Sequence, residues 1–364
     1  STPIKSSAAS DVYKRQVIVV CGDKSKVVSN SDMWETSTNY QTYQTQTTGF
    51  DGEGQITSAI TYVTSENNPK VYWVTGHGEA SESDLSTNFS DAINKNNVEI
   101  SDLALMTDDI PEDAEELVIM SPTTDFSEDE ANKVITYLEN GGKLLMFTSY
   151  TGTDMPNLDS ILENYGVKRS SGIVVETDSQ HYYPQMPYYL LPNIQSDDIT
   201  TEVKSNYILM PVAQAIQKLD SYRDTITIKS LLTTTEDAYI ENDPENSTWS
   251  KSADSETGAF DLGVSITETV DDKETQIIYF SSASMLSSQI DQAISGANSK
   301  LAATALTSMC DVEQTVVIPS KSTSYTNLVF TQGAVNTWSI ITIAGIPLVL
   351  VVIGVMIWMK RRKQ

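Results

Sequence analysis

Residues 117–147, LVIMSPTTDFSEDEANKVITYLENGGKLLMF, contain the pattern that decides the fold of this chain. They open with an apolar run at 117–120, which has the length of a buried strand. Ser121 and Pro122 end that run, and Ser127 is followed three residues later by Glu130, the sequence signature of a helix capping box. The stretch therefore predicts a strand, a turn and the start of a helix, in that order.

The helix predicted after the capping box has one apolar face and a clear end. The glycine pair at 141–142 ends it, because glycine readily adopts the backbone conformation found at helix C-termini. Residues 143–147 then form a second apolar run, which completes a strand–helix–strand unit. The apolar positions of the helix are Ala131, Val134, Ile135 and Leu138.

The same alternation continues on both sides of this unit. Apolar runs at 71–74 and 173–175 have the length of buried strands, and they do not alternate with polar residues, as expected when both faces of a sheet are covered. We therefore predict the α/β class, with a doubly wound and mostly parallel sheet. Helical spacing marks two more helices, one through Leu85, Phe89, Ala92 and Ile93, the other through Leu158, Ile161, Leu162 and Tyr165.

The flanking regions have weaker patterns. Short strands are predicted at 17–21 and 26–29, a polar stretch without a core pattern at 36–48, and a short helix at 56–63. In the second half we predict an ordered loop at 181–192 and helices at 211–219 and 301–309. Strict alternation from Phe260 to Ile266, a turn at 271–272 and an apolar run at 276–280 predict a hairpin at a sheet edge.

The two cysteines, Cys21 and Cys310, do not make a disulfide framework. Each has apolar neighbours, so we interpret both as small buried hydrophobes, with a single long-range disulfide as the alternative.

The C-terminal region carries a membrane-span signal. From Trp338 to Met359 there are 22 residues without a charge, and about 20 apolar residues are enough for a helix to cross a bilayer. Trp338 and Trp358 stand at the two ends, where indole rings favour the interface, and Pro347 lies within the span. The alternatives are a buried core helix or the tail signal of a lipid anchor. The basic residues that follow, which favour a cytoplasmic C-terminus, are Lys360, Arg361, Arg362 and Lys363.

The charge balance of the chain is strongly acidic. There are 23 Lys and Arg residues against 49 Asp and Glu, and four of the positive charges follow the span. Such a surface repels nucleic acids and anionic lipid headgroups, so no nucleic-acid partner is expected. The composition fits an extracytoplasmic domain that is held at the membrane by the C-terminal helix.

We predict the following organisation along the chain. Residues 1–16 resemble translated adapter sequence and are interpreted as a non-native leader, and a start within a strand-like run at 17 predicts missing upstream sequence. The other segments are a remnant of a truncated N-terminal segment at 17–66, an extracytoplasmic α/β domain at 67–325 with a possible sub-domain boundary near 180–200, a juxtamembrane segment at 326–337, the span at 338–359 and a cytoplasmic tail at 360–364.

One short motif invites a chemical interpretation. Gly76, His77, Gly78 and Glu79 follow a predicted strand of an open α/β sheet, where ligands usually bind. They form a candidate ligand site, in which His77 and Glu79 would act as base and orienting group or as metal ligands. The alternative is a tight turn, with His77 hydrogen-bonded to the neighbouring backbone.

Other catalytic patterns are missing from the sequence. It contains no nucleophile elbow, no phosphate-binding P-loop and no dinucleotide-binding glycine motif. The second histidine, His181, is distant in sequence, and no His-x-x-x-His or Cys-x-x-Cys is present. We therefore predict no catalytic residues, no metal and no cofactor.

Several motifs follow one another in an order that resembles a known family. The first are EGQITSAI at 53–60, PKVY at 69–72, TGHGE at 75–79, IPEDA at 110–114, SP at 121–122 and LENGGKL at 138–144. The later ones are YLLP at 189–192, MPVAQ at 210–214, IP at 346–347 and RR at 361–362. Over residues 17–363 the chain resembles the GldG-like family, auxiliary subunits of ABC-2-type transport systems first associated with gliding motility.

This resemblance implies a bacterial, non-catalytic subunit with an extracytoplasmic α/β domain between an N-terminal and a C-terminal membrane helix. It also implies two partners in the membrane, an ABC ATPase subunit and a multi-span ABC-2-type permease. The N-terminal helix of the family is absent from this sequence. Two other functions stay open at this stage, an extracellular hydrolase that uses the 76–79 loop and a ligand-binding adhesin.

Overall fold

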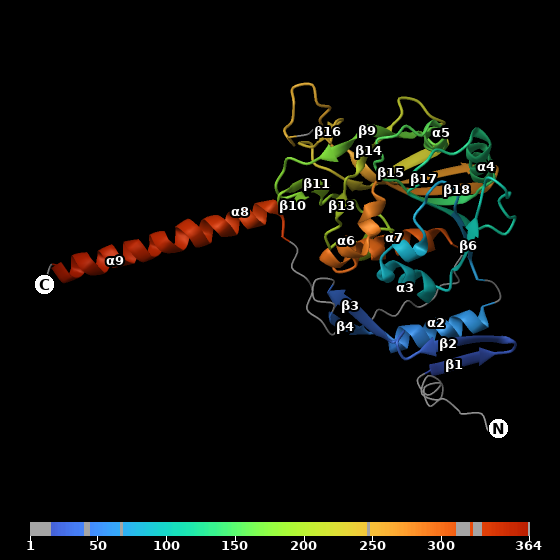
Figure 1. The fold of residues 1–364 in the computed structure, drawn as a ribbon, viewed down its shortest axis with the longest axis horizontal. Helices are drawn as coiled ribbons and strands as arrows, with labels where there is room; N and C mark the ends of the chain where they lie inside the picture. The colour runs from blue at the N-terminus through green and yellow to red at the C-terminus, as the bar shows by residue number, and fades with distance from the viewer. Residues whose placement is uncertain are drawn as a thin grey trace, which may run out of the picture.

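The computed structural model describes residues 16–39, 44–65, 68–245, 248–310, 321–322 and 330–362. They form a mixed α/β body from which one long C-terminal helix projects (Figure 1). The predicted leader, apart from Gln16, and Lys363 of the predicted tail lie outside the described residues.

The core of the body is a block of parallel strands. Their spatial order is β6-β5-β7-β8-β18, and all neighbours in this block are parallel. In chain order this is 2-1-3-4-5, the arrangement found in flavodoxin-like folds. The predicted α/β class is confirmed. The strands are β5 (Lys70–Val74), β6 (Glu99–Leu103), β7 (Glu116–Met120), β8 (Lys143–Phe147) and β18 (Lys273–Phe280).

Helices cover both faces of this block. Phe89 of α3 and Leu301 of α7 belong to one buried apolar cluster, whereas Val134 of α4 and Leu158 of α5 belong to a second. The sheet therefore separates two apolar cores. The predicted capping box is confirmed, because Ser127 caps α4. The helices are α3 (Thr87–Lys95), α4 (Glu128–Glu139), α5 (Pro156–Asn164) and α7 (Ala297–Met309).

The sheet continues beyond β18 with antiparallel strands. In the order β16-β9-β14-β17-β18 each strand is antiparallel to its neighbour, while β15 pairs with β17 and β12 with β15. The predicted hairpin at 260–280 exists, but its placement at a sheet edge is wrong, since it lies between β14 and β8. The strands are β9 (Val167–Val175), β12 (Asn193–Ile194), β14 (Gln214–Lys218), β15 (Ile226–Thr233), β16 (Tyr239–Glu241) and β17 (Asp261–Val270).

The helix predicted at 211–219 is wrong. This segment forms the end of β13 (Met210–Pro211) and strand β14, with Val212 at a φ of 53° between them. Gln214, Ala215 and Ile216 are all buried, because β14 lies inside the sheet. A short run that is buried on both faces has no period that separates a strand from a helix.

The N-terminal part packs beneath the α/β body (Figure 1). Strands β1 (Gln16–Cys21) and β2 (Lys24–Ser29) form the predicted hairpin, which packs on helix α2 (Gly52–Thr64). The stretch at 36–48, predicted to lack a core pattern, contributes to two further strands, which pair antiparallel with each other, and the rings of Trp34 and Phe50 lie 4.8 Å apart. They are β3 (Trp34–Asn39) and β4 (Gln44–Phe50), joined by β19 (Lys321–Ser322).

The two cysteines are not paired. Cys310 is buried as predicted, but Cys21 is exposed at the turn end of the first hairpin, and both are free thiols. The prediction of a buried Cys21 is therefore wrong, because the β1–β2 hairpin has only one covered face.

The predicted ordered loop at 181–192 contains a small hairpin. Its strands β10 (Tyr182–Tyr183) and β11 (Met186–Leu190) pair with each other, and β11 also pairs with β13. The remaining helical elements are η2 (Glu82–Asp84), η3 (Thr201–Val203), η4 (Ala283–Leu286), α6 (Ser288–Ala293) and the long C-terminal helix, which comprises α8 (Gln332–Ile340), a π-helical segment η5 (Ile341–Gly345) and α9 (Ile346–Arg362).

Candidate functional site

The loop at 76–79 follows β5 at the point where the strand order reverses. From β5 the chain moves to β6 on one side, and β7 lies on the other side. In open α/β sheets such a switch point, at the carboxyl ends of the strands, is the usual location of a ligand site. The candidate residues at 76–79 therefore lie where a ligand site is expected in this fold.

The side chain of His77 lies between two carboxylates. Its Nδ1 is 3.2 Å from Oε1 of Glu79, and its Nε2 is 3.2 Å from Oε2 of Glu130. The backbone N–H of His77 also donates to Oε2 of Glu79 over 2.7 Å. All three side chains are at most 5% exposed. The loop after β5 is thus joined through its histidine to the first turn of α4, a contact that the sequence analysis missed.

The carbonyl of His77 connects the loop after β5 to the loop after β7 through hydrogen bonds. It accepts hydrogen bonds from the backbone N–H groups of Thr123 and Thr124, over 2.8 and 3.1 Å, and both hydroxyls lie 3.2 Å from it. Gly78, with a φ of 76°, packs so closely that a Cβ there would lie 2.1 Å from Oγ1 of Thr123. The switch point is therefore filled by the chain itself.

Several groups act on the pKa of Glu130. Burial raises that pKa, but the N–H and hydroxyl of Ser127 donate to Oε2 over 2.8 and 2.7 Å, and His77 adds to their effect. The hydrogen bonds outweigh burial, so the pKa of Glu130 lies below its ordinary value. Glu130 is therefore a carboxylate at neutral pH, and it stabilises the N-terminus of α4.

This arrangement limits what the loop can do chemically. The polar side-chain atoms of His77 and Glu79 are turned inward, while Gly76 and Gly78 are exposed. Within the described ranges, no three His, Cys, Asp or Glu side chains come together in a way that could hold a metal ion. Ligand binding by Gly76, His77, Gly78 and Glu79 stays a prediction, and the accessible groups for it are backbone atoms of the glycines.

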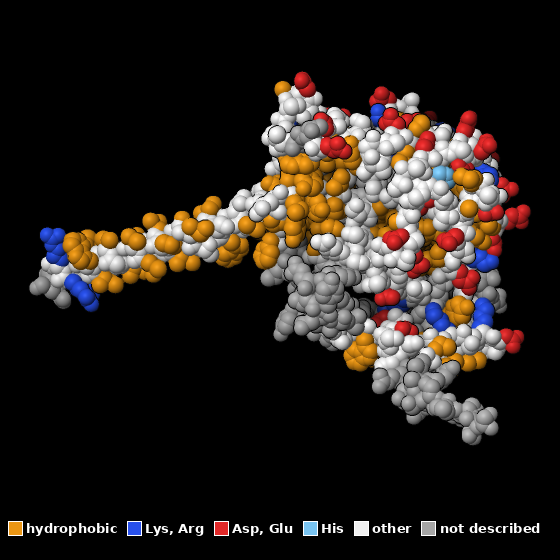
Figure 2. Space-filling model, in the orientation of Figure 1, with side chains coloured by type: hydrophobic (Ala, Val, Ile, Leu, Met, Phe, Trp, Pro, Cys, Tyr) orange, Lys and Arg blue, Asp and Glu red, His pale blue; other side chains and the backbone are white. Residues whose placement is uncertain are grey.

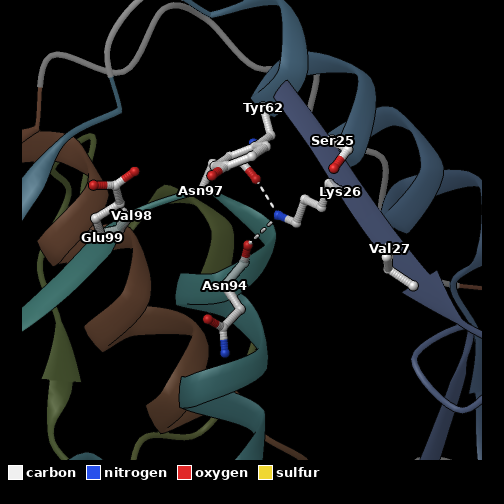
Figure 3. A pocket seen from close by; sticks show the side chains of 8 residues that line it. All are labelled: Ser25, Lys26, Val27, Tyr62, Asn94, Asn97, Val98 and Glu99. Atoms are coloured by element: carbon white, nitrogen blue, oxygen red, sulfur yellow. Dashed lines mark hydrogen bonds between the residues drawn. The ribbon is translucent and has the colours of Figure 1, made fainter. Parts of the chain in front are cut away.

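A pocket that the sequence did not indicate lies between the N-terminal part and the α/β body (Figure 3). It has a volume of about 330 Å³. Lys26 reaches across it from β2, donates to Oδ1 of Asn97 and lies 3.4 Å from the carbonyl of Asn94. Burial lowers the pKa of Lys26, and its Nζ lies 5.2 Å from the ring centre of Tyr62. These contacts attach β2 to the segment between α3 and β6.

The C-terminal helix has the properties of a candidate membrane span. It runs from Gln332 to Arg362, is 31 residues long, and no residue in its most apolar window is buried. The predicted anchor residues Trp338 and Trp358 are 61% and 59% exposed. Pro347 lies two residues after the π-helical segment η5, and the carbonyl four residues before it, that of Ile343, belongs to this segment. A proline ring clashes with the carbonyl at that position, which accounts for a wider turn there. Lys360, Arg361 and Arg362 form the last turn.

The start of this helix is fastened to the α/β body, which the sequence did not reveal. The N–H of Gly333 donates to the carbonyl of Ser179 over 2.6 Å, and the hydroxyl of Thr331 donates to Oε1 of Gln180 over 3.0 Å. The N–H of Gln185 donates to the side chain of Gln332 over 2.8 Å. The β10–β11 hairpin therefore contacts the first turn of α8.

Three solved structures share parts of this fold at low identity. The mmIFT52 N-terminal domain is 15% identical with a TM-score of 0.48, over 66% of this chain and 96% of that chain. A thua-like protein from Parabacteroides merdae is 13% identical with a TM-score of 0.38, over 73% and 99%. An exo-β-1,4-mannosidase from an Opitutaceae bacterium is 10% identical with a TM-score of 0.34, over 70% of this chain and 37% of the mannosidase. With TM-scores below 0.5, none of these carries a functional conclusion.

No curated protein matches this chain. A family described as an ABC-type uncharacterized transport system matches residues 68–308, more than half of the chain. The matched range begins just before β5 and ends within α7, so it contains the whole parallel block. The family resemblance of the sequence motifs is confirmed. The chain belongs to this family of auxiliary components of ABC-type transport systems.

Proposed function

We propose that this protein is a non-catalytic, membrane-anchored auxiliary subunit that works with a separate ABC ATPase and a multi-span ABC-2-type permease. The family match over residues 68–308 carries this proposal, and the exposed apolar helix supports it. The transport system would be of the kind used in export or in gliding-like motility of bacteria. The α/β body would bind a transported or cell-surface ligand, or stabilise the permease from outside.

The charges of the chain support an orientation with the body outside the cell. Lys360, Arg361, Arg362 and Lys363 follow the span, and positive residues next to a span favour the cytoplasmic side. The chain as a whole has a formal net charge of −26, which an extracytoplasmic domain tolerates well.

We propose that a permease helix packs against the small residues of the span. A Cβ added at Gly354 would meet no heavy atom within 4 Å, and Gly345 has a single backbone neighbour at 3.9 Å. Small residues let two membrane helices approach closely. Gly354→Leu should therefore weaken co-purification of the permease several-fold, whereas Val351→Leu, which changes an exposed apolar residue of the same helix, should not. Equal recovery with both variants would contradict this contact.

The proposed function is tested by purifying the protein in mild detergent from the membrane of its native host and identifying its partners by mass spectrometry. Recovery of an ABC ATPase and a multi-span permease in a fixed ratio is expected. Recovery of the protein alone, from a preparation in which another known membrane complex stays intact, would refute the auxiliary-subunit function. In that case His77→Ala and Glu79→Ala would test the hydrolase alternative.

A further inference from the structure

The side of the body next to the membrane helix has an uncharged, aromatic surface. Figure 2 shows a broad hydrophobic patch there, over β10, β11 and β13. Residues 182–196 contain no charged side chain, although a fifth of the whole chain is charged. The apolar side chains in this region that are at least partly exposed include Tyr182, Tyr183, Met186, Tyr188, Tyr189 and Tyr207, and we call them the tyrosine face.

The tyrosine face is built from ordered contacts. The rings of Tyr188 and Trp249 lie 4.4 Å apart, and those of Tyr188 and Tyr189 lie 5.4 Å apart. Met186 is 38% exposed and Tyr207 is 45% exposed. Contiguous exposed apolar patches often mark surfaces that bind a membrane or another molecule. Tyrosine and tryptophan combine an apolar ring with a polar group, which suits the boundary between lipid and water.

The attachment of α8 fixes where this face lies relative to the membrane. The hairpin that carries Met186 and Tyr188 contacts Gln332 and Gly333 directly. From Gly333 to Trp338 the helix rises by about 8 Å, at about 1.5 Å per residue. The headgroup layer on each side of the hydrocarbon core is itself about 5–8 Å thick. If Trp338 marks the edge of the hydrocarbon, the hairpin lies within or directly on the headgroup layer.

We propose that the tyrosine face rests on the lipid headgroup layer of the membrane that the C-terminal helix crosses. This inference rests on the proposed membrane anchoring and extends it from the helix to the body. The side chains of the tyrosine face carry no charge, so they can enter the headgroup layer without the cost of removing an ion from water, which the acidic remainder of the body would incur. Its tyrosines would sit among the headgroups while the helix holds the body in one orientation.

A spin-label experiment on the full chain tests this proposal. A nitroxide is attached after Met186→Cys in a Cys21→Ser background, because Cys21 is the exposed thiol and Cys310 is buried. The matched control is Met106→Cys, since Met106 is 70% exposed and follows β6 by three residues in the chain. Figure 1 shows β6 on the side of the body away from the helix. A third label after Ile353→Cys reports on the span. Each protein is reconstituted alone into phosphatidylcholine vesicles, and its accessibility to a water-soluble nickel chelate and to oxygen is measured.

We expect the label at position 186 to be several-fold less accessible to the nickel chelate than the label at 106, with the label at 353 in the oxygen-rich hydrocarbon. Equal accessibility at 186 and 106, with 353 in the hydrocarbon, would overturn the proposal and leave the anchor intact. Protection at 186 that appears only after the permease is added would also overturn it, in favour of a protein partner. A water-accessible label at 353 would refute the anchoring itself.

The junction offers a second variant. A Cβ at Gly333 would lie 1.7 Å from Nε2 of Gln180, so in Gly333→Val the side chain of Gln180 has to move, which disturbs its hydrogen bond with Thr331 at the junction. This variant should raise the chelate accessibility at 186 towards that at 106 and leave the label at 353 unchanged. Unchanged protection at 186 in Gly333→Val would show that the hairpin attachment does not position the face.

Discussion

The imidazole of His77 is held between two carboxylates that have almost no contact with water. Burying charged groups is costly unless each has a partner, and here Glu79 and Glu130 share one ring. Oε2 of Glu130 also accepts from the N–H and hydroxyl of Ser127, whereas its Oε1 has no hydrogen-bond partner among the described residues, so His77 adds to the compensation that Ser127 provides. The stability of the loop after β5 therefore depends on this ring.

His77→Ala should lower the free energy of unfolding by about 2 kcal/mol, because it removes one partner from each of two buried carboxylates. Glu79 keeps the hydrogen bond from the backbone N–H of residue 77, and Glu130 keeps those from Ser127. Urea denaturation followed by circular dichroism measures this change. The control is His181→Ala, at a side chain that is 26% exposed, for which we expect less than about 1 kcal/mol. A similar small loss for both variants would show that the cluster at His77 does not stabilise the fold.

Glu268 is expected to make the stability depend on pH. Arg223 donates to both its carboxylate oxygens, over 2.8 and 2.7 Å, and this lowers the pKa of Glu268 below its ordinary value. A lowered pKa in the folded state contributes stability above the unfolded-state pKa, and this contribution is lost as the pH falls through the folded-state pKa. Because Arg223 is 41% exposed, we expect only about 1 kcal/mol.

The measurement compares the protein with Glu268→Gln by urea denaturation at several values between neutral and acidic pH. The wild type should be the more stable at neutral pH, and the difference should disappear towards the acidic end. A constant difference across this range would contradict the contribution of the ionised pair.

The sequence showed part of the cluster at His77. Glu79 is two residues away, so its proximity was evident, and Glu130 was identified as a capping residue. Its contact with His77 was not, because 53 residues separate them and only the placement of β7 beside β5 brings α4 to the loop. Contacts of this kind follow from strand order, which local patterns do not specify.

Helices and strands were predictable where a face pattern or a turn signal marked them. The capping box, the helix of 85–93 and the strands around 117–147 all have a clear period or a clear end, and all were found. The segment at 211–219 has neither a clear period nor a clear end, because the first three residues of β14 are all buried. The antiparallel half of the sheet was recognised only as separate pieces, because its strand order joins segments that are far apart in the sequence.

At the N-terminus of α7 a single buried side chain joins three helical segments. Oδ1 of Asp291 accepts the N–H of Ser299 over 2.9 Å, and Oδ2 accepts from Ser86, Asn88 and the Ser299 hydroxyl. Asp291 is fully buried, so its loss leaves several donors without an acceptor.

Asp291→Ala should therefore lower the stability by about 3 kcal/mol, since each unsatisfied buried polar group costs about 1–3 kcal/mol. Thermal unfolding followed by circular dichroism measures this. Asp224→Ala, at an exposed turn with an ordinary backbone conformation, serves as the control and should change little. If the two variants unfold at the same temperature, Asp291 does not organise this end of α7.

Across the whole molecule, the strands on either side of residues 180–200 join one sheet, since β18 pairs with β8 and β14 with β9. Both apolar cores also draw on both halves of the chain. The sub-domain boundary and the other segment limits remain proposals. The C-terminal helix, in contrast, buries only Gly333 among its residues.

A chain that ends at Thr331 should therefore fold like the full protein. We expect a soluble α/β body whose thermal midpoint, measured by circular dichroism, lies within a few degrees of that of the full chain in detergent. Loss of cooperative unfolding in the shortened chain would show that the helix contributes to the core.

The hydrogen bonds between the β10–β11 hairpin and the start of α8 have a mechanical consequence. The helix runs without a break from Gln332 to Arg362, so these hydrogen bonds would make the body and the proposed span rotate together. Membrane helices tilt by about 20° on average, and a change of tilt imposed inside the bilayer would swing the body outside through the same angle. With the body outside the cell and a permease beside the span, as proposed, movement of the permease would reach the cell exterior without any change within the α/β body.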